Sequence, residues 1–248
     1  MNNLKSSRRD FLTVSALTGS ALILNACVPA ASNTNTQPPK PSDDKKEKEV
    51  TAIEDLMREH GILRRALLVF GEAAVMLPGN PPAVWADAVQ KAAKLFRAFG
   101  EDYHEKKLEE GYIFPLIKQK GMTGPAASYP DILIAQHNRG REITDYILSA
   151  TASGKMGANA SDVANALHGF VRMYENHAAR EDTVVFPAWK DLITENEYDE
   201  LGEKFEDIEH EEFGDDGYED AVKKISEIES SLGLSDISIF TPAAPAKV

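Results

Sequence analysis

A duplicated arrangement of histidines, acidic residues and a Phe-Pro pair restricts the fold of this chain more than any other feature of its sequence. The first copy occupies residues 104–115 and reads HEKKLEEGYIFP, and the second occupies residues 177–187 and reads HAAREDTVVFP. When the copies are aligned on Phe-Pro, the matched acidic residues are Glu109 with Glu181 and Glu110 with Asp182.

A lone histidine with an arginine four residues later precedes each copy. These upstream pairs are His60 with Arg64 and His137 with Arg141. Four histidines and two glutamates at matched places indicate a single site with approximate two-fold symmetry. The metal-ligand candidates are His60, His104, Glu109, His137, His177 and Glu181, with Glu105 as an additional or substitute ligand.

The spacing between histidine and glutamate differs in the two copies. His177 lies four residues before Glu181, so both side chains can point to one centre from the same face of a helix. His104 lies five residues before Glu109, which turns the glutamate by about 140° around an α-helix axis. The first copy therefore forms a shared site only if its helix contains a π-bulge, or if the long glutamate side chain bridges two metals.

The residue types indicate which metal such a site would hold. Imidazoles and carboxylates inside a protein core need a compensating positive charge, which a metal ion supplies. The single cysteine, Cys27, excludes an intramolecular disulfide and a cysteine-based zinc or iron–sulfur site. Histidine and carboxylate ligands suit non-haem iron, with manganese and zinc as less specific alternatives. Two bridging glutamates with four histidines form a dinuclear arrangement.

From Ile53 onward, apolar residues recur at three- and four-residue intervals, a spacing that predicts helices. No strand-like alternation of useful length occurs. The long predicted helices cover residues 53–77, 83–118, 131–150 and 162–192, and two shorter acidic helices cover residues 197–213 and 217–232. Long helices joined by short loops predict an all-α fold, namely an antiparallel up-down four-helix bundle with two extra short C-terminal helices.

The predicted organisation has five parts. They are a signal peptide at 1–27, a disordered tether at 28–50, the bundle at 51–192, an acidic helical extension at 193–232 and a loose tail at 233–248. The tether is polar and Pro-rich, and such a segment cannot bury a core. The extension is expected to pack on the bundle as one face of the same domain.

The first 27 residues have the pattern of an export signal. Arg8 and Arg9 form a twin-arginine pair, and the apolar run at 12–26 is too short to span a membrane. The sequence LNAC that ends at Cys27 resembles a lipobox, in which cleavage before the cysteine accompanies its lipidation. We expect export by the twin-arginine pathway and a lipid anchor at the periplasmic or extracellular face of a bacterial membrane.

The charge of the chain excludes one class of partner. Its net charge is −13, and because residues 1–27 contribute +2, the remainder carries −15. Nucleic-acid binding needs clustered lysine and arginine, so an acidic body of this kind argues against it. The expected partners are a small ligand such as oxygen or peroxide, and the membrane through the N-terminal lipid. The sequence identifies no protein partner.

These motifs resemble the hemerythrin-like (HHE cation-binding) family over about residues 51–192. The resemblance rests on the segment EDLMREH at 54–60, on both histidine–glutamate–Phe-Pro copies, and on the pair of His137 and Arg141. It implies a four-helix bundle around an oxo- or hydroxo-bridged di-iron centre. In that arrangement the four histidines would be terminal ligands, and the two glutamates would bridge the metals.

One position departs from the family pattern. Oxygen-carrying hemerythrins have a further histidine four residues after the third, and Arg141 stands there in this chain. The resemblance therefore favours reversible oxygen storage less, and redox chemistry with oxygen or peroxide more. Arg64 and Arg141 can pair with the bridging carboxylates or with surface acids.

Four other residues near the motifs have ordinary interpretations. Tyr103 and Tyr174 are interpreted as packing residues, with a role as ligand or hydrogen-bonding partner as the alternative. His168 lies on the opposite side of its helix from His177, and His210 lies on a solvated acidic face, so neither is expected to bind metal.

Three functions follow from this pattern. In the first, an exported, lipid-anchored protein uses non-haem iron to bind oxygen or a related ligand, as a sensor, scavenger or store. In the second, the same site belongs to a di-iron oxidase, peroxidase or ferroxidase. In the third, the metal only stabilises a bundle that acts as an interaction module. The sequence does not decide between binding and catalysis.

Overall fold

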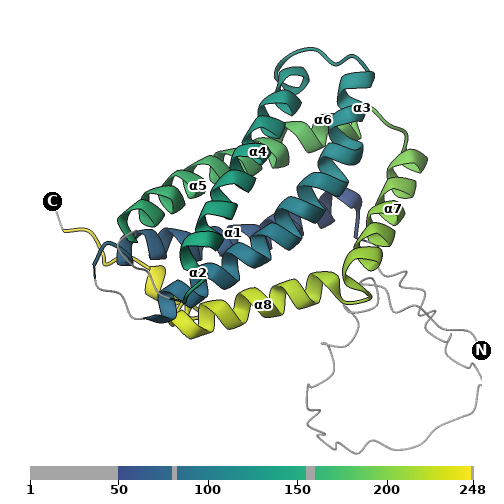
Figure 1. The fold of residues 1–248 in the computed structure, drawn as a ribbon. Coiled ribbons are helices and arrows are strands. Elements are labelled where there is room, and N and C mark those ends of the chain that lie inside the picture. The colour runs from purple at the N-terminus through teal and green to yellow at the C-terminus, as the bar shows by residue number, and fades with distance from the viewer. Residues whose placement is uncertain (1–49, 80–82, 155–159, 247–248) are drawn as a thin grey trace, which may run out of the picture. The chain divides into compact units, whose positions relative to one another are not determined.

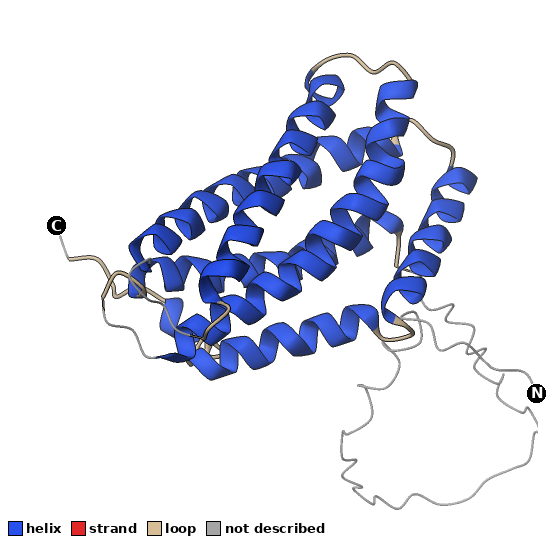
Figure 2. Ribbon diagram, in the orientation of Figure 1, coloured by secondary structure: helices blue, strands red, loops and turns tan. Residues whose placement is uncertain are grey.

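The computed structural model describes residues 50–79, 83–154 and 160–246. Within these ranges every regular element is a helix and no strand occurs (Figure 2), which confirms the all-α prediction. The signal peptide and nearly all of the tether lie outside the described residues. Among the residues that the structure describes, no helix is both long and apolar enough to cross a membrane.

The first helix, α1, runs over Ala52–Met76. It begins with a capping box, in which the Thr51 hydroxyl accepts from the Glu54 backbone N–H and the Glu54 carboxylate accepts from the Thr51 N–H. The next elements follow one another without a break and are α2 (Ala83–Leu95), the π-helix η2 (Phe96–Ile113) and α3 (Phe114–Gln119). Together they occupy the predicted helix at 83–118.

The second half repeats this layout. It consists of α4 (Pro125–Thr151), followed by α5 (Ala160–Arg180), the π-helix η3 (Glu181–Val185) and α6 (Phe186–Lys190). The last three again form one uninterrupted helical stretch. The acidic extension then forms α7 (Glu195–Phe213) and α8 (Gly217–Leu232).

These elements pack as a helical bundle (Figure 1). Helix α1 contacts α2 and α5, and α4 also contacts α2 and α5, so the four surround a common core. Aromatic rings fill that core, and the T-shaped pairs of Phe96 with Phe170 and with Tyr174 have centroids 4.9 and 4.8 Å apart. The extension packs on the same unit, because α7 contacts α1 and η2, and α8 contacts α1 and α2.

Two boundaries differ from the predictions. Helix α4 begins at Pro125 instead of residue 131, because a proline is tolerated in the first turn, where backbone N–H groups have no helical acceptor. The tail is not wholly irregular, since Ile237–Phe240 form a short 3-10 helix, η4, whose start is capped by the Asp236 carboxylate.

Candidate metal centre

Both Phe-Pro pairs lie directly after a π-helical turn. The N–H of Phe114 donates to the carbonyl of Glu109, and the N–H of Phe186 donates to the carbonyl of Glu181, each five residues earlier. A proline inside a helix has no N–H and its ring presses on the carbonyl four residues before it, so a wider preceding turn relieves the clash. Of the two arrangements that the five-residue spacing allowed, the structure has the π-helix.

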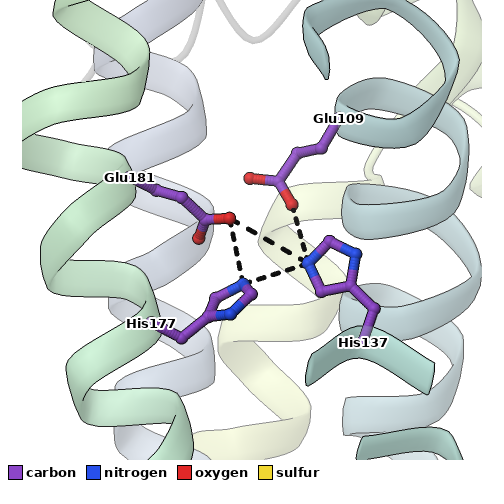
Figure 3. Close-up of side chains that lie close together, drawn as sticks. All are labelled: Glu109, His137, His177 and Glu181. Atoms are coloured by element: carbon purple, nitrogen blue, oxygen red, sulfur yellow. Dashed lines mark hydrogen bonds and ion pairs between the residues drawn. The ribbon is translucent and has the colours of Figure 1, made fainter. Parts of the chain in front are cut away.

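The π turns bring the six candidate ligands together in the core. They come from α1, η2, α4, α5 and η3, and each is at most 4% exposed; they are His60, His104, Glu109, His137, His177 and Glu181. Figure 3 shows four of them, with Glu109 and Glu181 directed toward the rings of His137 and His177. The sequence-based prediction of one convergent cluster is confirmed in its geometry.

The four histidines form two pairs. The Nε2 atoms of His60 and His104 lie 3.0 Å apart, and so do the Nε2 atoms of His137 and His177. The two pairs also have the same ring geometry, with centroids 4.7 Å apart and an interplanar angle of 51°. This agreement between halves is the two-fold symmetry that the repeated motif predicted.

Each glutamate faces both histidine pairs. In Glu109, Oε1 lies 3.4 Å from Nε2 of His104 and Oε2 lies 3.3 Å from Nε2 of His137. In Glu181, Oε2 lies 3.5 Å from Nε2 of His60 and Oε1 lies 2.9 Å from Nε2 of His177. Each carboxylate therefore offers one oxygen to each side of the cluster.

These glutamate oxygens are the test of whether the residues fit a metal. All four are buried and have no hydrogen-bond partner within the described part of the chain. Buried carboxylate oxygens without donors are costly, and a cation at the meeting point of the Nε2 atoms would satisfy them. Two sets of side chains are close enough to hold an ion, one of His60, His104 and Glu109 and one of Glu109, His137, His177 and Glu181.

The other ring nitrogen of every histidine has a fixed partner. The Nδ1–H groups donate to oxygens of Asp182, Glu59, Glu110 and Gln136, at 2.7, 2.6, 3.0 and 2.9 Å from His60, His104, His137 and His177. Carboxylate and amide oxygens can only accept, so each Nδ1 must carry a proton. In the neutral ring the Nε2 lone pair then points into the centre, as a metal ligand requires.

The motif arginines hold the acids that orient His60 and His137. Arg64 pairs with Asp182, and Arg141 donates to Glu110 at 2.7 Å. The pKa of Glu110 falls to about 2, because hydrogen bonds from His137, Lys106 and Arg141 outweigh burial. Both arginines thus act on the acid beside the bridging glutamate, and not on the bridging glutamate itself.

The phenylalanines of the two motifs have a matching role. Phe186 stacks on the ring of His60 with centroids 5.5 Å apart, and Phe114 stacks on His137 at 5.8 Å. Both phenylalanines are fully buried. They fix the ring planes from the side opposite the partner histidine.

The charges of the cluster balance one another. Burial opposes ionisation of Glu109, but His104 and His137 hold its pKa well below the usual range. Burial also opposes protonation of His104, yet Glu109 and Glu59 raise its pKa well above the usual value. Against burial, Glu105, Glu109 and Glu110 raise the pKa of His137 to about 10. Each histidine pair therefore shares one proton across its 3.0 Å contact, opposite one buried glutamate.

Glu105 lies beside this cluster and faces other partners. Its carboxylate accepts from the Tyr174 hydroxyl at 2.8 Å and from Arg141 at 3.1 Å, and lies 3.9 Å from Nδ1 of His137. Tyr174 fits there because position 140 is a glycine, where a Cβ would come within 2.0 Å of the Tyr174 oxygen. The tyrosine therefore both packs and forms a hydrogen bond.

A small cavity adjoins the cluster. Its volume is about 10 Å³, which is room for about one water-sized molecule. The walls away from the candidate ligands include Leu63, Leu67, Phe96 and Tyr174. A molecule that entered this space would meet an apolar wall on one side and the histidine–glutamate cluster on the other.

Two residues of the centre were not found from the sequence. Glu59 and Gln136 each precede a motif histidine by one position, and that shared placement was the available signal. Among the other candidates, His168 is exposed on α5 and His210 is partly buried on α7, both outside the cluster. Cys27 lies outside the described residues.

The fold and the site together define a class, that of helical-bundle proteins with a buried histidine–glutamate cluster compatible with metal binding. The family model named Hemerythrin HHE cation binding domain matches residues 51–189. The chain belongs to this family. The matched segment covers α1 to α6 up to Trp189 and ends before α7.

Curated relatives have been described only as uncharacterized proteins. One from Mycobacterium bovis and two from strains of Mycobacterium tuberculosis are each 42% identical to this chain over 244 residues, which covers 95% of this chain and 91% of the relative. No solved structure matches the chain significantly.

Proposed function

We propose that the protein holds two non-haem iron ions in this centre and binds oxygen or a related small ligand there, as a sensor, scavenger or store. The scaffold would be an antiparallel up-down four-helix bundle extended by α7 and α8. Four histidines would be terminal ligands, and Glu109 and Glu181 would bridge the metals. The observation that carries the proposal is that each buried glutamate has one oxygen facing each histidine pair.

The residues around the ligands prepare them for this role. The Nδ1 partners hold each ring in the tautomer that leaves Nε2 free, and the stacked phenylalanines hold the ring planes. Iron bound there would supply reversible electron transfer and a coordination position for the small ligand. Manganese or zinc would fit the same donors, so metal analysis of protein folded inside cells is part of the test.

The adjoining cavity supports a ligand of very few atoms. Its volume of about 10 Å³ leaves no room for an organic substrate next to the cluster. Its apolar walls at Leu63, Leu67 and Phe96 favour a weakly hydrated molecule such as oxygen. The size of the cavity therefore agrees with small-ligand binding better than with modification of a large substrate.

Replacing His177 by alanine should lower the metal content, because it removes one Nε2 donor and leaves Glu181 Oε1 without its 2.9 Å partner. The measurement is metal per chain by elemental analysis, together with the optical spectrum. His168→Ala is the matched control, since His168 lies on the same helix and is exposed. Unchanged metal stoichiometry in His177→Ala would count against the proposed centre.

A di-iron oxidase, peroxidase or ferroxidase is the second candidate. The observation that favours it is Tyr174, which lines the cavity and donates its hydroxyl proton to buried Glu105, so a proton donor lies next to the ligand space. Oxygenation of the reduced protein separates the candidates. A stable, reversible oxygen-dependent spectrum supports binding, and turnover of peroxide or ferrous iron supports catalysis. A metal that ignores oxygen, peroxide and azide would indicate a purely structural role.

We also propose export and lipid anchoring for the full chain, on the strength of Arg8, Arg9 and the lipobox that ends at Cys27. In a bacterial host with a twin-arginine pathway, the wild type should fractionate with the membrane. Cys27→Ala should release the exported protein into the soluble fraction, and replacement of both arginines by lysine should keep it in the cytoplasm. Membrane association that persists in Cys27→Ala would exclude the lipid as the anchor.

A further inference from the structure

A groove of about 320 Å³ lies between α8 and the segment formed by α2 and the start of η2. Figure 1 shows α8 running alongside this segment in the opposite direction. None of the six candidate metal ligands lines the groove. One of its walls belongs to α8, beyond the residues matched by the hemerythrin model.

One end of the groove is apolar. Phe99 and Phe213 close it with rings whose centroids lie 5.8 Å apart, and Gly217 leaves that end without a further side chain. Leu95 and Ala221 continue the apolar walls along the two antiparallel helices. Any group that fills this end must therefore be apolar.

The other part of the groove is cationic. Lys91, Lys94 and Lys224 line it, and Glu227 is its one acidic lining residue. Lys91 already pairs with Asp87 at 2.7 Å. Lys94 and Lys224 have no ion-pair partner in the described ranges, although the chain has 40 acidic residues against 27 basic ones. Two uncompensated ammonium groups thus face each other across an apolar space, one from α2 and one from α8.

We propose that this groove binds a free long-chain carboxylate, with the apolar tail against Phe99 and Phe213 and the carboxylate between Lys94 and Lys224. The arrangement of the walls matches that of an amphiphile, since one end is apolar and the other cationic. At about 30 Å³ for each water-sized unit, 320 Å³ accommodates about ten such units. That is one acyl chain of medium length, and it leaves no room for the two chains of a phospholipid.

The test is displacement of a fluorescent dansyl-labelled undecanoate from the full chain by dodecanoate. We expect one binding site per chain, with dodecanoate at least about tenfold stronger than dodecanol, which has the same tail without the charge. Inorganic phosphate should not displace the probe, because it cannot fill the apolar end. Equal binding of dodecanol, or displacement by phosphate alone, would overturn the assignment of tail and head.

Matched variants locate the site. The double substitution Lys94→Glu and Lys224→Glu should weaken dodecanoate binding by about tenfold or more, while Lys204→Glu with Lys223→Glu changes net charge equally at exposed lysines that do not line the groove. Ala98→Trp, at an exposed lining position, should abolish binding by filling the space, with helicity checked by circular dichroism. Equal weakening by both charge pairs, or full binding in Ala98→Trp, would contradict the proposal.

Discussion

Removal of bound metal is expected to lower the melting temperature much more at pH 9 than at pH 6. In the metal-free cluster the two histidine pairs hold protons opposite Glu109 and Glu181. A metal ion carries its charge at every pH, whereas these protons are lost as the pH rises. The stabilising effect of the metal should therefore grow with pH.

The sign follows from the pKa of each group. The pKa of His137 is raised from 6.5 to about 10, so its contribution to stability is complete below about pH 6.5 and disappears as the pH rises through 10. The pKa of His104 is raised in the same direction. The pKa of Glu110 is lowered from 4.5 to about 2, so its contribution is present above pH 4.5 and is lost only toward pH 2. Metal-free protein should be most stable between about pH 4.5 and 6.5.

The effect should be large enough to measure by differential scanning fluorimetry. One pKa unit corresponds to about 1.4 kcal/mol, so the raised histidines represent a few kcal/mol. In a domain of this size that equals a change in melting temperature on the order of 10 °C between pH 6 and pH 9. Samples with chelator and with restored metal are compared at each pH. Parallel curves for the two samples would show that the cluster protons and the metal do not compete.

The second large effect concerns the two histidine pairs, which we expect to bind metal with unequal strength. His104 donates to a carboxylate, Glu59, at 2.6 Å, while its counterpart His177 donates to the neutral amide of Gln136 at 2.9 Å. A carboxylate acceptor makes the opposite ring nitrogen a stronger donor to a metal. The position between His60 and His104 should therefore fill first.

Glu59→Gln tests this with a minimal change of shape. It should weaken the stronger position by about 10- to 100-fold and leave the other nearly unchanged, as second-shell substitutions of this kind do. Gln136→Glu should strengthen the weaker position. Competition titrations with a chromophoric chelator measure both affinities without relying on activity.

Glu101→Gln is the control for loss of a buried carboxylate in the same domain, because Glu101 hydrogen-bonds Thr144 and not a candidate ligand. Two equal affinities in the wild type would refute the inequality while leaving the dinuclear proposal intact. Absence of metal from all proteins, the wild type included, would instead refute the centre itself.

The sequence predicted the cluster because its members carry a repeated, unusual pattern. Four histidines and two glutamates at matched positions could be assigned to one site before their distances were known, and the Phe-Pro pairs supplied the alignment. The helical character of the fold was equally accessible, since the apolar spacing extends through every long helix.

Other features depend on tertiary packing and left little trace in the sequence. Glu59 and Gln136 look like ordinary polar residues of helices, and their role arises only where α1 meets η2 and α4 meets α5. The π-helix was one of two alternatives, because a five-residue spacing also suits a long bridging side chain. Its extent over Phe96–Ile113 was not predicted, since π turns have no propensity signature comparable to the α-helical period.

The wide turns before Pro115 and Pro187 have a consequence for how chains of this kind can change in length. A π turn contains more residues than an α turn, so losing one residue between His104 and Phe114 would convert it to ordinary winding and rotate everything beyond it by about 100°. Glu109 would then leave its place between the histidine pairs. Deletions that the connecting loops could absorb would thus abolish the centre when they fall inside this helix.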